Sequence, residues 1–175
     1  MTVEEFVILV DQQDNAIGQM EKQEAHLQNR KRRAFSVFLL DKQGNLILQQ
    51  RADSKYHSPG LWTNSCCGHP RPNETTIEAA KRRTFEELGI HIDIKEVLQL
   101  SYEEQLENDL WENEFDHIFI GNFNEDIPNP NPEEVQAIKN RSVANIETDL
   151  KENPQDYTFW FKLIFPRIKQ MLIRQ

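Results

Sequence analysis

The sequence contains little that could form disulfides or cross a membrane. Its only two cysteines, Cys66 and Cys67, are adjacent, which excludes a disulfide framework. No apolar run approaches the roughly 18 residues that a membrane-spanning helix needs. The first residues also lack the basic and apolar stretches of a secretory signal. We therefore expect a soluble protein in a reducing compartment, the cytoplasm, without membrane association.

Positive charge is scarce as well. Lysine and arginine number 20 against 29 aspartates and glutamates, a net charge of −9. Proteins that bind nucleic acids or anionic membrane surfaces through phosphate contacts need a basic excess, so the charge argues against both partners. Hydrophobic residues make up 38%, including ten phenylalanines and three tryptophans, which is enough for a core and excludes a disordered chain. The length predicts one domain over residues 1–175.

Strand and helix signals alternate without a regular strand–helix–strand repeat. Apolar runs separated by turn residues predict hairpins at residues 6–17 and 34–50. Further strands are expected at 92–102, 112–123 and about 135–143, and helices at 21–28, 75–88, 146–151 and 159–173. This mixture predicts an α+β fold in which a mixed β-sheet is sandwiched between α-helices.

Residues 75–88 carry the clearest helix signal. Thr75 and Glu78 have the spacing of a capping box, and Gly89 stands where a helix-terminating glycine is expected. The buried face is predicted from residues three or four positions apart, namely Ile77, Ala80, Thr84 and Leu88.

Charged residues recur in and around this helix at a defined spacing. The pattern G-x5-E-x7-R-x3-E-E-x-G is formed by Gly68, Glu74, Arg82, Glu86, Glu87 and Gly89. Carboxylates on a rigid helix can bind Mg²⁺ while an anionic ligand supplies further oxygens. Periodicity alone favours the alternative, a solvated helix with ion pairs. The full spacing, however, resembles the Nudix box, which positions an Mg²⁺–diphosphate unit. Arg83 stands where most Nudix hydrolases have a metal-binding glutamate, which argues against plain pyrophosphate hydrolysis.

Two further segments contain candidate reactive side chains. Cys67, two residues before His69, could be a nucleophile, an acid or a metal ligand, or simply a small buried residue. Because neighbours in an extended segment face opposite sides, only one of Cys66 and Cys67 can reach a shared site. Glu112 and Glu114 would share one strand face. They could bind a metal or transfer protons, and a solvated strand face is the alternative.

Together these segments resemble type I isopentenyl-diphosphate isomerase, a cysteine-containing branch of the Nudix superfamily. The matching segments are RAFSVF at 33–38, QRADSK at 50–55, WTNSCCGHP at 62–70 and WENE at 111–114. The resemblance implies interconversion of isopentenyl and dimethylallyl diphosphate by adding and removing a proton, in isoprenoid biosynthesis. It implies a small prenyl diphosphate as the partner and no obligate protein partner. A Nudix pyrophosphohydrolase and a non-catalytic prenyl-diphosphate binder are the alternatives.

The resemblance also implies roles for individual residues. Cys67 and Glu114 would act on opposite sides of the alkene, with Glu114, helped by Tyr102, protonating it and Cys67 deprotonating it. Trp160 matches an aromatic residue whose face would stabilise the carbocation. Glu87 would share an Mg²⁺ with the diphosphate. The basic diphosphate contacts would be Lys22, Arg51, Lys55 and Arg83.

The family also binds a second divalent metal, Mg²⁺, Mn²⁺ or Zn²⁺, through three histidines and two glutamates. Four of these positions match, namely His26, His69, Glu112 and Glu114. Arg32 stands at the remaining histidine position, and a guanidinium cannot ligate a metal. None of the other histidines is an obvious substitute, so we expect weaker metal binding than in typical relatives. Either four protein ligands and water hold the metal, or Arg32 displaces it and pairs with the glutamates.

Overall fold

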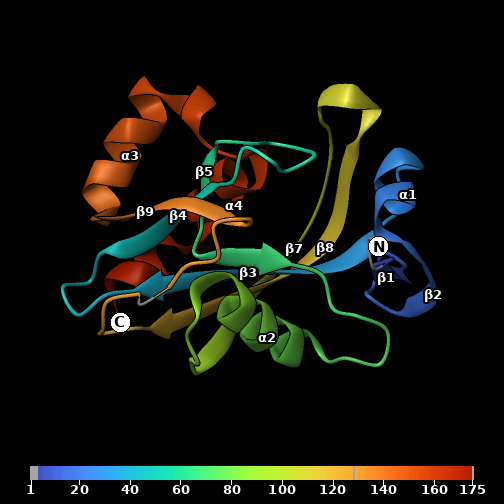
Figure 1. The fold of residues 1–175 in the computed structure, drawn as a ribbon, viewed down its shortest axis with the longest axis horizontal. Coiled ribbons are helices and arrows are strands. Elements are labelled where there is room, and N and C mark those ends of the chain that lie inside the picture. Colours follow the sequence, from blue (N-terminus) through green and yellow to red (C-terminus); the bar gives the residue numbers. More distant parts are fainter. Residues whose placement is uncertain (1–3, 128, 175) are drawn as a thin grey trace.

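One long strand, β3 (Arg32–Leu40), organises the sheet (Figure 1). The computed structural model describes residues 4–127 and 129–174, and their strands form one nine-stranded sheet. Along one edge, β3 pairs in parallel with β8 (Trp111–Asn122) over its full length. Along the other edge it meets three antiparallel strands in turn, β1 (Phe6–Val10), β6 (Cys66–Gly68) and β4 (Leu46–Arg51). The central strand therefore brings distant segments to one place.

The other strands extend the sheet from these neighbours. The strand β7 (Ile94–Gln105) pairs antiparallel with β8, and β2 (Ala16–Glu21) pairs antiparallel with β1. Both β5 (Trp62–Thr63) and β9 (Val135–Arg141) pair antiparallel with β4. The helices are α1 (Lys22–Leu27), α2 (Thr76–Leu88), α3 (Val143–Glu152) and α4 (Phe159–Ile173), with short 3₁₀ turns at Glu107–Asp109 and Pro154–Asp156.

The two faces of the sheet are covered by different helices. Successive side chains of a strand point to opposite faces. Phe38 and Leu40 accordingly join a cluster with Phe161 of α4, whereas Phe35, Val37 and Leu39 join another with α2. Figure 1 shows α2 on one side of the sheet and α3 and α4 on the other. The predicted α+β fold, with a mixed sheet between helices, is confirmed.

The helix α2 begins as its sequence predicts. The Thr75 hydroxyl accepts the Glu78 backbone N–H and the Glu78 carboxylate accepts the Thr75 N–H, which completes the capping box. Gly89 ends the helix in the left-handed conformation with φ of 73°, which costs glycine little. The prediction that Ile77 belongs to the buried face is wrong, because its residue is 40% exposed. Ile77 lies in the first turn, outside the apolar cluster that α2 covers.

The two cysteines lie on β6, and they face opposite sides as predicted. Cys66 is fully buried in the cluster under α2, whereas Cys67 packs against the cluster under α4. The strand itself was not expected, because it is only three residues long and depends on pairing with β3. Among the residues that the structure describes, no helix combines the length and apolar character needed to span a bilayer.

Gly121 on β8 provides a test of the packing between β8 and its neighbours. A Cβ there would lie 2.8 Å from the backbone oxygen of Asp93 and 3.1 Å from Leu39 Cδ2. We expect Gly121→Ala to lower the free energy of unfolding by about 1–3 kcal/mol through overpacking. Gly18→Ala on β2 is the control, because its Cβ would meet only Leu9 Cδ1 at 4.0 Å. Equilibrium urea unfolding measures both, and equal losses would contradict the packing described.

Candidate active site

A cleft with about 820 Å³ of open space lies where β3, β6, β8 and α2 meet the loop after β4. All four predicted catalytic residues and all four predicted diphosphate contacts line it. Of the predicted metal ligands, His69, Glu87, Glu112 and Glu114 line it as well. The fifth, His26, is fully buried and lies beside Glu112. The structure thus brings together every site residue that the sequence indicated.

Glu114 has a hydrogen-bond partner on each of its two carboxylate oxygens. Its strand partner across the β7–β8 ladder is Tyr102, whose hydroxyl donates to Glu114 Oε2 at 2.7 Å. His69 Nε2 lies 2.8 Å from Oε1. Burial alone would raise the pKa of Glu114, but the His69 hydrogen bond and the charges of His69 and Arg32 lower this pKa well below its ordinary value. Glu114 is therefore a fixed carboxylate with a phenol attached to it.

Cys67 and Glu114 reach the cleft from opposite edges of β3. Cys67 belongs to β6, which pairs with one edge, and Glu114 belongs to β8, which pairs with the other. Burial raises the pKa of the Cys67 thiol to about 12, so the free protein holds it in the protonated form. A partly buried thiol and a buried carboxylate thus line the same cleft.

An aromatic surface completes this part of the cleft. Trp160, at the start of α4, has its residue surface only 3% exposed. Its indole Nε1 has no hydrogen-bond partner within the described residues. The guanidinium carbon of Arg51 lies 5.4 Å from the ring centroid, a distance at which the ring face attracts a cation.

The predicted diphosphate contacts come from four different elements and hold protein acceptors in the free cleft. Lys22 of α1 pairs with Glu5 at 2.9 Å, and Lys55 of the loop after β4 pairs with Glu134. Arg51 donates to the carbonyl oxygens of His57 and Ser58 at 3.1 and 3.2 Å. The two lysine pairs are partly solvated, so an anionic ligand can exchange with them.

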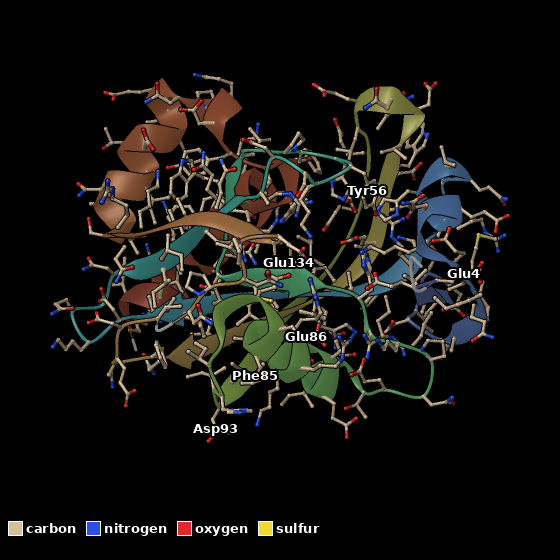
Figure 2. The ribbon with its side chains drawn as sticks, viewed as in Figure 1. Glu4, Tyr56, Phe85, Glu86, Asp93 and Glu134 are labelled. Carbon is tan, nitrogen blue, oxygen red and sulfur yellow. The ribbon has the colours of Figure 1, made fainter. Side chains whose placement is uncertain are left out.

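Arg83 connects α2 to the rest of this basic group. It pairs with Glu87 at 2.6 Å, Glu86 at 2.8 Å and Glu134 at 3.3 Å, and the last two are labelled near α2 in Figure 2. Gln49 donates to the other oxygen of Glu87 at 2.8 Å. Arg83 therefore pairs with both acidic residues at the end of the box, and its single charge offsets that of one of them.

Arg32 is the charge centre of the other end of the cleft. Its side chain is fully buried, and its Nη2 lies 2.9 Å from Glu112 Oε2 and 3.5 Å from Glu114 Oε1. Its Nε lies 3.3 Å from His69 Nε2. Arg32 thus pairs with both glutamates, which is one part of the second expected alternative.

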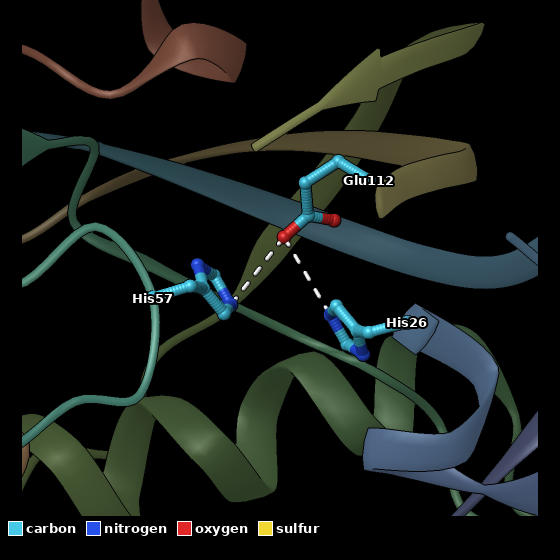
Figure 3. Close-up of side chains that lie close together, drawn as sticks. All are labelled: His26, His57 and Glu112. Carbon is cyan, nitrogen blue, oxygen red and sulfur yellow. Dashed lines mark ion pairs between the residues drawn. The ribbon is translucent and has the colours of Figure 1, made fainter. Parts of the chain in front are cut away.

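Sequence reasoning missed His57. Its Nε2 lies 3.4 Å from Glu112 Oε1, and His26 Nε2 lies 3.6 Å from the same oxygen (Figure 3). These three side chains form a cluster compatible with divalent-metal binding. The sequence offered no obvious substitute for the histidine position that Arg32 occupies, and the structure places His57 beside Glu112. Burial, reinforced by Arg32, lowers the pKa of His26 to about 3, and burial also lowers that of His57, so both rings are neutral.

The other two histidines lie elsewhere. His117 hydrogen-bonds with Asp14 and Glu96, and His91 stacks on Phe85. The only sequence signal for His57 was its position two residues after the matched segment at residues 50–55. The loop after β4 folds back over the cleft, and its Tyr56 ring packs edge-on against both His26 and His57.

The fold and this site define the class of the protein. Residues 30–161 match the NUDIX domain family. A solved structure from Deinococcus radiodurans superposes with a TM-score of 0.78 at 19% identity, covering 93% of this chain and 98% of that one. The MutT protein from Methanosarcina mazei Go1 gives 0.66 at 18% identity, covering 81% and 94%. These likenesses establish a NUDIX fold.

Relatives with higher sequence identity narrow the family. The isopentenyl-diphosphate Delta-isomerase of Serratia proteamaculans is 46% identical over 162 residues, which cover 93% of this chain and 90% of that protein. The protein of the same name from Pectobacterium atrosepticum is 43% identical with the same coverage. The chain belongs to the isopentenyl-diphosphate Delta-isomerase family of NUDIX proteins.

Replacing Arg32 tests its role as the buried counter-charge. We expect Arg32→Met to lower the free energy of unfolding by about 3–5 kcal/mol, because Glu112 and Glu114 would then be buried without the guanidinium. The control is Arg33→Met on the same strand, whose partly solvated pair with Asp14 predicts a loss of roughly 1 kcal/mol or less. Urea unfolding in the presence of a chelator measures both. Similar losses in the two variants would refute the assignment.

Proposed function

We propose that this chain interconverts isopentenyl diphosphate and dimethylallyl diphosphate. The observation that carries the proposal is the pairing of a partly buried thiol, Cys67, with a buried carboxylate, Glu114, in one cleft lined by Trp160 and by cationic side chains that include the four predicted diphosphate contacts. The names of the relatives, 43–46% identical over 93% of the chain, support the same reaction.

The reaction needs two proton-transferring groups at one small substrate. Adding a proton to the terminal carbon of the alkene produces a tertiary carbocation. Removing a proton from the methylene carbon next to the cationic carbon then leaves the double bond shifted. Cys67 and Glu114 are the pair that would carry these protons, with the Tyr102 hydroxyl on Glu114 as a relay. The face of Trp160 would stabilise the cation without forming a bond to it.

The division of the two steps depends on protonation. In the free protein the thiol is the protonated member of the pair, because burial raises the pKa of Cys67, whereas that of Glu114 is lowered. The order expected from the family resemblance, with Glu114 donating first, therefore requires Glu114 to gain a proton when the substrate binds. The diphosphate and the exclusion of water from the cleft would both act in that direction.

The diphosphate would be bound by Lys22, Arg51, Lys55 and Arg83, together with Mg²⁺ held by Glu87. The Glu87 residue is 5% exposed and lines the cleft. Its oxygens accept from Arg83 and Gln49 and keep further lone pairs for a metal. Mg²⁺ would neutralise the diphosphate charge. Arg83 pairs with both Glu86 and Glu87. These carboxylates are therefore less available to activate water, and the site favours binding the diphosphate over hydrolysing it.

The compartment follows from the same chemistry. Both cysteines are free in the structure, and Cys67 must stay a thiol to exchange protons. We therefore place the reaction in a reducing compartment, the cytoplasm.

The first test is the conversion itself. The purified protein is incubated with isopentenyl diphosphate and Mg²⁺, and we expect dimethylallyl diphosphate without release of phosphate. Cys67→Ala should reduce turnover at least about 100-fold, because a group that transfers a proton in the transition state contributes at least that much and no other thiol faces the cleft among the described residues.

Cys66→Ala is the matched control for this experiment. Its thiol lies in the core under α2, so the variant should keep turnover within a few-fold of the unmodified protein. Release of phosphate without dimethylallyl diphosphate would favour the hydrolase alternative, and binding without turnover would favour the non-catalytic binder. Wild-type turnover in Cys67→Ala would defeat the assignment of Cys67.

A second test addresses the diphosphate contacts. We expect Lys55→Met to raise KM for isopentenyl diphosphate about 10-fold or more, because a charge-assisted hydrogen bond contributes roughly 1.5–3 kcal/mol. The value of kcat should change far less than KM. Lys81→Met is the control, because Lys81 on α2 pairs with the exposed Asp93 outside the cleft. An unchanged KM in Lys55→Met would remove Lys55 from the diphosphate site.

A further inference from the structure

The second metal site that the family resemblance implies does not fit this chain in its expected form. That form uses three histidines and two glutamates, and Arg32 occupies one histidine position. Its buried guanidinium donates to Glu112 Oε2 at 2.9 Å and lies against Glu114 and His69. A guanidinium has no lone pair to offer a metal. It also contacts both His69 and Glu114, whose Nε2 and Oε1 atoms lie 2.8 Å apart.

The second oxygen of Glu112 has a different environment. Oε1 faces His26 Nε2 at 3.6 Å and His57 Nε2 at 3.4 Å, and the three atoms all lie within 4.8 Å of one another (Figure 3). These residues come from α1, the loop after β4 and β8. Side chains from three separate segments therefore direct their donor atoms at one point.

The tautomer of His26 directs a nitrogen lone pair at this point. His26 Nδ1 lies 2.7 Å from the Lys22 carbonyl oxygen. A carbonyl can only accept, so Nδ1 carries the hydrogen of the neutral ring and Nε2 presents a lone pair. That lone pair faces Glu112 Oε1, with the Tyr56 hydroxyl 3.5 Å from the same nitrogen, and either a proton on Glu112 or a metal cation between the two residues relieves their repulsion. Histidines that ligate metals characteristically donate their other N–H to a backbone carbonyl or a carboxylate.

We propose that the chain has a rearranged divalent-metal site formed by His26, His57 and Glu112, in which His57 supplies the ligand that Arg32 cannot. The spacing fits, because tetrahedral ligands about 2.0–2.1 Å from Zn²⁺ lie about 3.3 Å apart, close to the observed 3.4 and 3.6 Å. Two imidazoles and one carboxylate suit Zn²⁺ or a similar transition metal better than Mg²⁺.

In this arrangement Glu112 and Glu114 have different roles. Glu112 would bind the metal through Oε1 and Arg32 through Oε2, whereas Glu114 keeps its bonds to His69 and Tyr102. His69 and Glu114 are then not ligands. Because Arg32 shares the Glu112 carboxylate, we expect weaker metal binding than at a site with two carboxylate ligands. The inference does not depend on isomerase activity, since metal binding is measured without substrate.

The test is metal titration of the full-length protein after chelator treatment. We expect one Zn²⁺ per chain in the absence of substrate and Mg²⁺, and intense visible absorption from four-coordinate Co²⁺. His57→Ala should weaken Zn²⁺ binding at least 100-fold and abolish that absorption. His91→Ala is the matched control, because its ring stacks on Phe85, and it should bind like the unmodified protein.

A further variant separates this site from the five-ligand site of the family. His69→Ala should retain Zn²⁺ affinity within about fivefold, whereas the family arrangement predicts its loss. Circular dichroism and thermal unfolding without metal check that each variant is folded, and His57→Gln replaces His57→Ala if needed. The inference is overturned if the unmodified protein binds no Zn²⁺, if His57→Ala binds like it, or if His69→Ala loses the metal.

Discussion

The burial of two carboxylates at one end of the central parallel strand pair constrains the whole site. Glu112 and Glu114 lie on the same face of β8, and Arg32 is the register partner of Glu114 on β3. Two buried carboxylates cannot both stay ionised without counter-charge. The Arg32 guanidinium supplies one charge, and His69 and Tyr102 supply hydrogen bonds to Glu114. The remaining oxygen of Glu112 is left facing two imidazoles, which is why a further cation is attractive there.

The central strand β3 also separates the residues that pack the core from the reactive side chains. One face of β3 packs against α2 through Phe35, Val37 and Leu39, and this packing fixes the helix whose end contributes Arg83 and Glu87. The strands on the two edges of β3 contribute Cys67 and Glu114. A ligand held by the basic residues is thereby presented to a thiol and a carboxylate on rigid strands, which hold side chains more precisely than loops do.

The helix shared with NUDIX hydrolases has a different charge balance here. Arg83 pairs with both Glu86 and Glu87 and also with Glu134. A helix end with one cation between two carboxylates offers fewer metal ligands than one with three carboxylates. Its cation can still pair with a diphosphate. The Cys67 thiol on β6 and the Arg83 side chain on α2 line the same cleft.

The sequence by itself determined the elements and most of the site. The capping box and Gly89 place α2 and the apolar runs place β3 and β8, because these signals are local, and the family resemblance selects Cys67, Glu114 and Arg83. Only the tertiary structure decided where the loop after β4 lies. His57 is 31 residues from His26 and 55 from Glu112, and no periodicity relates a loop residue to a helix and a strand so distant. Its place depends on how the loop packs over the cleft.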